Sequence, residues 1–306
     1  GIIVDKPKTI VAFPGREAFG KERKDDFYRS FPEVRRVFEL AGDLFHQDFV
    51  SLCYRSDTLE ERWLPLVLAV HSYAISRVVC RLVEEPAGFI GYSQGEFLAC
   101  AAAGAVDFAD VLKTMEALEE LLREPVEKRQ DMYRIVEMSR EELQDFCRRA
   151  SFDSYTGISA YISRDQHVIS GEQPSLQRAV RSVRKRGARW VLPLNTRRGF
   201  HSCLCDEVQR RAAPYFKKAA VRNTIVPVYS CLDGGKSRDG QQIWSKLSRQ
   251  ISHPLRWETL VNALNLDGAT RLIEIGPGCT VSANTRIGGA RFTCTWIHQE
   301  KDLEGI

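Results

Sequence analysis

Paired cysteine spacing is absent from this sequence of 306 residues, although it contains nine cysteines. Disulfide frameworks usually show an even number of cysteines, and structural zinc sites usually show two closely spaced pairs. We therefore expect reduced thiols. Cys203 and Cys205 flank a single leucine close to His201, which makes them candidate metal ligands. Because no Cys-x-x-Cys pair accompanies them, the sequence predicts no bound metal.

Long apolar runs are also absent. No segment approaches the roughly 18 uninterrupted apolar residues of a membrane span. The N-terminal segment GIIVDKPKTIVAF lacks the basic region and the long apolar core of a signal peptide. Hydrophobic residues make up 43% of the chain and charged residues 27%, as in ordinary soluble globular proteins. We expect a cytoplasmic protein and no membrane partner.

The net charge is small, with a formal value of +4. Arginine is nevertheless concentrated in two stretches, residues 178–189 and 196–201. One interpretation is the solvated face of a helix, and the other is a docking surface for an acidic partner. A basic motif interleaved with aromatic residues is missing, so we expect no nucleic-acid partner.

Internal repeats and low-complexity linkers are missing as well, and the length allows one large domain and a smaller one. Short apolar runs at residues 9–13, 87–92, 225–231 and 271–276 indicate buried strands. Helical stretches lie between them, and residues 63–83 are apolar nearly all round, which indicates a buried helix. Strands that alternate with helices predict a mainly parallel sheet in an α/β domain.

A different pattern occupies the middle of the chain. Candidate strands YRIVEM, GISAYIS, HVISGE and ARWVLPL enclose the helices SREELQDFCRRA and PSLQRAVRSVRKRG. Ser-x-x-Glu opens the first helix as a capping box, and the second has proline at its start and glycine at its end. The order βαββαβ predicts a ferredoxin-like subdomain at residues 131–195. Residues 1–130 and 196–306 would then form the large domain.

One serine stands between two glycines where a predicted strand becomes a helix. Gly91-Tyr92-Ser93-Gln94-Gly95 matches G-x-S-x-G, in which a sharp elbow exposes a hydroxyl at the N-terminus of a helix. The N–H groups at that terminus favour a developing oxyanion. The alternative is a tight turn with a structural serine. A serine nucleophile needs a base.

Six histidines are candidates for that base. His46 and His71 lie in helical stretches, His167 lies in a predicted strand, and His298 is near the C-terminus. His253 precedes a proline in a loop. His201 follows the predicted subdomain, with Gly199 nearby and a helix after it, and it is the best-placed candidate.

Several motifs together resemble one family. VAFPG, GYSQGE, GFHS, PVYS, QISHPLRW and IEIGPG occur in the order and at about the spacing found in malonyl-CoA:acyl carrier protein transacylases. That family includes the acyltransferase domains of polyketide synthases. The similarity covers almost the whole chain. It implies a large α/β-hydrolase-like domain with an inserted ferredoxin-like subdomain.

The resemblance also implies roles for individual residues. Ser93 matches the nucleophile, His201 matches the general base, and Gln250 matches the residue whose main-chain carbonyl orients that histidine. The backbone N–H groups of Gln94 and Arg16 match the oxyanion hole. No bound cofactor is implied, because the phosphopantetheine arm belongs to the substrate, which is an acyl carrier protein or coenzyme A. We expect a monomer that acts on an acyl thioester.

Departures from the family concern the acyl pocket. The arginine that grips the carboxylate of malonyl groups falls twenty-five positions after the nucleophile, and this position is Leu118 here. Leu64 and Ile162 also replace polar family residues. We expect the acyl pocket to be lined by Leu118, Leu64, Ile162, Tyr92, Gly199 and Phe200. A pocket of this kind predicts an acyl group without a terminal carboxylate, since an unpaired buried carboxylate is costly.

Three functions follow from these observations. The favoured one is an acyltransferase that moves a non-carboxylated acyl group between pantetheine thioesters in polyketide-type biosynthesis. A hydrolase that removes stalled acyl groups from carrier proteins is the alternative, and an inactive carrier-binding module is a third. Carrier proteins are generally acidic, so we expect docking at Arg184, Arg186, Arg197 and Arg198.

Overall fold

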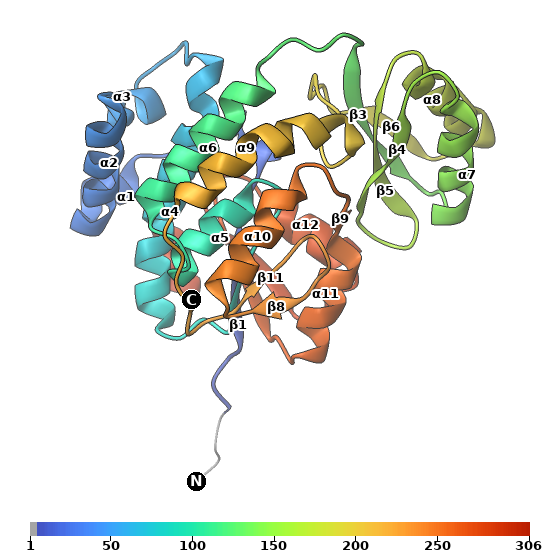
Figure 1. Ribbon diagram of the computed structural model, residues 1–306. Coiled ribbons are helices and arrows are strands. Elements are labelled where there is room, and N and C mark those ends of the chain that lie inside the picture. The colour runs from blue at the N-terminus through green and yellow to red at the C-terminus, as the bar shows by residue number, and fades with distance from the viewer. Residues whose placement is uncertain (1–4) are drawn as a thin grey trace.

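The computed structural model describes residues 5–306 and contains two β-sheets, each flanked by helices (Figure 1). The larger sheet has the strand order β11-β10-β1-β2-β7-β8, and its first five strands run parallel. Only β8 is antiparallel to its neighbour. The expected mainly parallel sheet is therefore confirmed. Its strands are β1 (Thr9–Phe13), β2 (Gly88–Gly91), β7 (Val228–Tyr229), β8 (Lys236–Ser237), β10 (Arg271–Ile275) and β11 (Thr293–Ile297).

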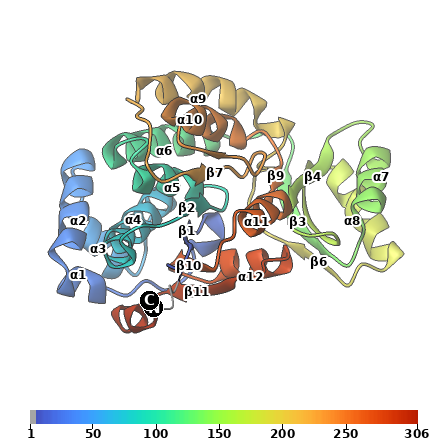
Figure 2. The same cartoon turned by 90° about the horizontal axis from the view of Figure 1, so that it is seen from below.

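Helices cover both faces of this sheet, as a parallel sheet requires (Figure 2). In chain order they are α1 (Asp26–Ser30), α2 (Pro32–Phe45), α3 (Phe49–Tyr54), α4 (Leu64–Val83), α5 (Gly95–Ala103), α6 (Phe108–Leu122), α9 (Asp206–Lys218), α10 (Gly240–Gln250), α11 (Trp257–Leu266) and α12 (Thr280–Ile287). Short 3₁₀ turns include η1 (Arg16–Ala18) and η2 (Glu61–Trp63).

The helix α4 is largely buried, as its apolar sequence indicated. Together with η2 it is long and apolar enough to cross a membrane, and it is the one helix in residues 5–306 that meets this criterion. However, 67% of its most apolar 18-residue window is buried inside the protein. The helix packs against α2, α5 and α6, so its apolar surface is satisfied by the protein core.

The second sheet is formed mainly by the middle of the chain. β3 (Gln130–Val136), α7 (Arg140–Ala150), β4 (Thr156–Tyr161), β5 (Gln166–Glu172), α8 (Ser175–Arg186) and β6 (Trp190–Pro193) follow one another. The strand order β6-β3-β5-β4 and the antiparallel pairing confirm the ferredoxin-like unit. The bounds 131–195 that we propose for the unit enclose all of these elements except the first residue of β3.

The two faces of the second sheet have different surroundings. Tyr133 and Ile169 pack under α7 and α8 in a core of their own. Met132, Ala160 and Val168 point to the opposite face and belong to the main hydrophobic core. Figure 2 shows α7 and α8 on the side away from the large domain. The open face of the small sheet is therefore turned toward the large domain.

Several elements were not predicted. These are α12, β8, β11 and β9 (Leu255–Arg256), a two-residue strand of the large domain that pairs with β4. Conversely, the strand predicted at residues 225–231 is only two residues long. Pro227 has no N–H to donate to a ladder, and the chain turns at Ser230, whose N–H bonds the carbonyl of Gly235. Such short pairings leave no periodic pattern in the sequence.

The start of α5 lies against the end of β1. A Cβ atom on Gly95 would be 2.3 Å from the carbonyl oxygen of Phe13 and 2.6 Å from that of Pro14. These contacts are with backbone atoms, which cannot move away independently. Glycine at position 95 therefore lets the elbow after β2 approach the loop after β1.

We predict that Gly95→Ala lowers the free energy of unfolding by about 2 kcal/mol or more, because overpacking against backbone forces a shift of the elbow. Gly20→Ala is the matched control, since a Cβ there meets no atom within 4 Å. Urea unfolding followed by circular dichroism measures both variants. Equal stability of the two would contradict the close approach at Gly95.

Candidate active site

Ser93 lies at the elbow between β2 and α5. Its φ angle is 53°, in the left-handed region that side chains other than glycine rarely adopt. This conformation turns the chain sharply, so that the hydroxyl leaves the sheet at the C-terminal end of β2. A strained serine at a strand-to-helix turn is the geometry that the G-x-S-x-G pattern predicts.

His201 is within hydrogen-bond distance of this serine. Ser93 Oγ and His201 Nε2 are 2.7 Å apart, and His201 Nδ1 is 2.9 Å from the main-chain oxygen of Gln250. The backbone N–H of His201 also donates to the carbonyl of Ile251. If Nδ1 carries the proton and donates it to Gln250, then Nε2 is free to accept the proton of the serine.

Burial lowers the pKa of His201. His201 is 3% exposed, and the loss of solvent lowers its pKa from 6.5 to about 4. The hydrogen bond to Gln250 opposes this effect, while the positive charge of Arg16 adds to it. The imidazole is consequently neutral near pH 7, which is the state that a general base requires.

Two backbone N–H groups adjoin the serine. Gln94 directly precedes α5, and Arg16 is the first residue of η1. The first N–H groups of a helix have no partner inside it, so both are available to an oxyanion. Gly15 brings the second one close: a Cβ on Gly15 would lie 3.4 Å from Ser93 Cβ and 2.4 Å from the carbonyl oxygen of Tyr92.

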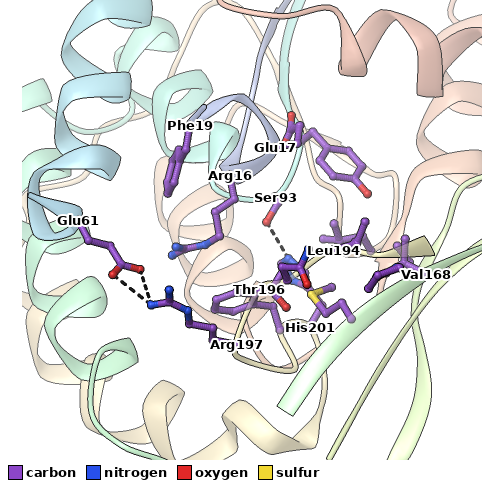
Figure 3. Close-up of a pocket in the computed structure, with 17 residues that line it drawn as sticks. Arg16, Glu17, Phe19, Glu61, Ser93, Val168, Leu194, Thr196, Arg197 and His201 are labelled. Carbon is purple, nitrogen blue, oxygen red and sulfur yellow. Dashed lines mark hydrogen bonds and ion pairs between the residues drawn. The ribbon is translucent and has the colours of Figure 1, made fainter. Parts of the chain in front are cut away.

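A cavity of about 530 Å³ opens beside Ser93 and His201 (Figure 3). The large domain contributes one wall, and the open face of the small sheet contributes the other. Tyr92 and Phe200 line it, as the sequence analysis predicted for the acyl pocket. The other lining residues are Arg16, Glu17, Phe19, Glu61, Met132, Ala160, Val168, Pro193, Leu194, Asn195, Thr196, Arg197 and Leu255.

The other predicted pocket residues are placed differently. Leu118 is 5% exposed and lines a narrow space of about 20 Å³ that also touches Ser93. Arg16, Phe200 and Ser93 border both spaces, so the narrow space adjoins the main cavity at the serine. The residues lining the main cavity include neither Leu64, Ile162 nor Gly199.

Two acidic residues in or beside the cavity were not anticipated. Glu119 is 5% exposed and forms an ion pair with Arg16. Glu17 accepts a hydrogen bond from the N–H of Gly15, and burial raises its pKa to about 7. Glu119 could have been found from the sequence, because it lies four positions after Met115 and three before Leu122, on the apolar face of its helix. An acid on an apolar face signals a buried partner.

The four arginines proposed for carrier docking do not form one cluster. Arg184 and Arg186 lie on α8, on the outer face of the small sheet, and Arg186 pairs with Glu142 of α7. Arg198 is buried and donates to main-chain oxygens at the end of α6, so its docking role is corrected to a structural one. Arg197 alone lies at the cavity mouth, where it pairs with Glu61 (Figure 3).

Residues 5–306 contain no group of three or more His, Cys, Asp or Glu side chains arranged to hold a metal ion. All nine cysteines are free thiols.

The model of the acyl transferase domain family matches residues 65–291. The chain belongs to this family. Residues 1–64 and 292–306 lie outside the match, yet the similarity to individual proteins extends over most of the chain.

A malonyl CoA-acyl carrier protein transacylase of Haemophilus influenzae is 27% identical over 286 residues, which is 91% of each chain. An acyl carrier protein S-malonyltransferase of Vibrio cholerae has a crystal structure with a TM-score of 0.91 and 25% identity, covering 97% of this chain and 99% of that one. A malonyl-transacylase solved in complex with a type II polyketide synthase acyl-carrier protein has a TM-score of 0.89 and 25% identity, covering 97% and 98%. The resemblance inferred from the motifs is therefore confirmed, and so is acyl transfer as the class of activity.

The pKa of His201 generates a prediction about pH. Protonated His201 cannot accept the proton of Ser93, so the rate of Ser93 acylation should fall only as the pH drops through about 4. Rapid-quench measurement of acylation by a neutral acyl thioester tests this, with circular dichroism at each pH to verify that the protein remains folded. An acid limb near the ordinary histidine value of 6.5 would show that His201 is hydrated or is not the base.

Proposed function

We propose that Ser93 takes an acyl group from one pantetheine thioester and passes it to another. Ser93 Oγ attacks the thioester carbonyl while His201 Nε2 accepts the hydroxyl proton. The N–H groups of Gln94 and Arg16 stabilise the oxyanion. When the tetrahedral intermediate collapses, the C–S bond breaks and His201 gives the proton to the departing thiolate. An incoming thiol reverses these steps and receives the acyl group.

The acyl group in this proposal lacks a terminal carboxylate. The observation that carries it is the pairing of charges beside Ser93. Leu118 stands where the resemblance predicts an arginine, and the guanidinium that lines the cavity beside Ser93, that of Arg16, is already paired with Glu119. A malonyl carboxylate would have to leave water, and the two guanidiniums among the described residues that line the cavity, those of Arg16 and Arg197, already have carboxylate partners. Even a penalty of about 3 kcal/mol slows acylation roughly a hundredfold.

Apolar side chains on the small sheet support the same proposal. Met132, Val168 and Leu194 line the cavity opposite Ser93. Each buried methylene of an alkyl chain contributes about 0.8 kcal/mol on such a surface. We therefore propose a monocarboxylic or elongated acyl chain. The polyketide synthase carrier in the neighbouring complex supports polyketide-type biosynthesis as the setting, and the free thiols support a cytoplasmic one.

Competing acyl-CoA substrates test this function. We predict that hexanoyl-CoA and acetyl-CoA acylate Ser93 faster than malonyl-CoA does. The difference in rate should be roughly a hundredfold, as a penalty of about 3 kcal/mol on the malonyl carboxylate implies. Intact-protein mass spectrometry follows the acyl mass over time. Ser93→Ala is the control and should gain no acyl mass. A faster rate with malonyl-CoA would overturn the proposed acyl class.

The same assay separates transfer from hydrolysis. The acyl-enzyme is isolated and divided between buffer and buffer with an empty carrier protein. Transfer predicts a stable acyl-enzyme in buffer and an acylated carrier in the second sample. Rapid loss of the acyl mass in both samples would instead establish the hydrolase that removes stalled acyl groups.

We further propose that the acyl carrier protein docks at the cavity mouth beside Arg197. This side chain is 81% exposed, so its attraction for an acidic carrier acts mainly on encounter and weakens with salt. We predict that Arg197→Ala slows transfer to the carrier by about threefold to tenfold at low salt while leaving acylation by acyl-CoA nearly unchanged.

Arg184→Ala is the matched control for this docking prediction, because α8 lies on the outer face of the small sheet. Kinetics at several salt concentrations compare the two variants. If Arg184→Ala slows transfer more than Arg197→Ala does, the carrier docks on α8.

A further inference from the structure

The Arg16 side chain enters the cavity directly next to the nucleophile. Its backbone belongs to η1, but its guanidinium extends between two aromatic rings, 4.6 Å from the ring centre of Phe200 and 5.2 Å from that of Phe19. Figure 3 shows it beside Ser93. The side chain is 28% exposed, so a substrate in the cavity can reach it. Arg16 also borders the narrow space that Leu118 lines.

Glu119 is the anionic partner of this guanidinium. One of its carboxylate oxygens, Oε1, accepts a hydrogen bond from Arg16 Nη2 and a second one, of 2.7 Å, from the side-chain amide of Gln94. Because the carboxylate is almost fully buried, it depends on these two donors for stabilisation. Any carboxylate on a substrate would compete with Glu119 for Arg16.

We infer that Glu119 determines the acyl specificity of this site by occupying the guanidinium of Arg16, so that carboxylated acyl groups find no cation. The inference rests on the proposed function, since it explains how neutral acyl groups are favoured. It assigns exclusion to a carboxylate that the protein itself supplies, in addition to the missing arginine at position 118. Removing the charge of Glu119 should turn Arg16 into a binding group for a malonyl carboxylate through charge-assisted hydrogen bonds.

A simple structural role of Glu119 has to be distinguished from this specificity role. Glu119 also tethers the side chain of Gln94, whose backbone N–H is a proposed oxyanion donor. Loss of the tether would slow acylation by every acyl group alike. The ratio of the malonyl rate to the hexanoyl rate is insensitive to that loss, and it therefore reports specificity alone.

The experiment compares Glu119→Gln, Arg16→Gln and the double variant with the unmodified protein. Glu120→Gln is the matched control, because Glu120 is the exposed neighbour on the same helix. Acylation of Ser93 by malonyl-CoA and by hexanoyl-CoA is measured for each. Glu119→Gln should raise the malonyl-to-hexanoyl ratio by about tenfold or more, as expected for a charge-assisted hydrogen bond that becomes available. In the double variant this rise should disappear.

Two outcomes would overturn the inference: an unchanged ratio in Glu119→Gln, or a rise that persists in the double variant. Glu119→Ala serves as a second variant if Glu119→Gln unfolds, with thermal unfolding measured for both. The failure of the proposed function looks different. If the proposed function is wrong, the unmodified protein already prefers malonyl-CoA to hexanoyl-CoA. Glu119→Gln then tests separately whether Arg16 binds the malonyl carboxylate.

Discussion

The hydrogen bond between Ser93 Oγ and His201 Nε2 joins the elbow after β2 to the loop that follows the inserted unit. Both side chains line the cavity between the two sheets. Two main-chain oxygens position His201: that of Gln250 contacts its ring Nδ1, and that of Ile251 accepts its backbone N–H. Since these partners are backbone atoms, the geometry does not depend on which side chains occupy those positions.

Arg16 contributes both a backbone N–H and a positive charge to the surroundings of Ser93 and His201. Its backbone N–H is a proposed oxyanion donor, and its guanidinium is close enough to lower the pKa of His201. In the proposed acylation step His201 becomes cationic, and an uncompensated arginine nearby would oppose that step. Glu119 offsets this charge from a buried position. The ion pair thus allows a large cation to lie beside the proposed base, in addition to the exclusion that we infer for it.

The parts of the site that were predictable from sequence are those set by local pattern. The elbow around Ser93 is encoded by two glycines and a strand-to-helix change, and the ferredoxin-like unit by its order of elements. Arg16 was expected to contribute only its backbone N–H. The position of its side chain was not predictable, because it depends on a partner distant in sequence, Glu119, which is 103 positions away. Leu118 was expected to line the acyl pocket, but it lines a separate narrow space that Ser93, Arg16 and Phe200 also border. The strand β9 escaped prediction because two residues carry no periodicity.

The large domain and the inserted unit contribute different kinds of side chain to the cavity. The proposed nucleophile, the proposed base and the candidate oxyanion donors all come from the large domain. Much of the opposite wall comes from the inserted unit, through Met132, Ala160, Val168 and Leu194. Those four side chains are close to the reacting atoms yet take no part in the hydrogen bonds around His201. Their size and polarity can therefore change without disturbing the base. Charge cannot be changed so freely, because Arg16 and Glu119 lie on the catalytic side, where a new charge acts on His201 as well as on the acyl group.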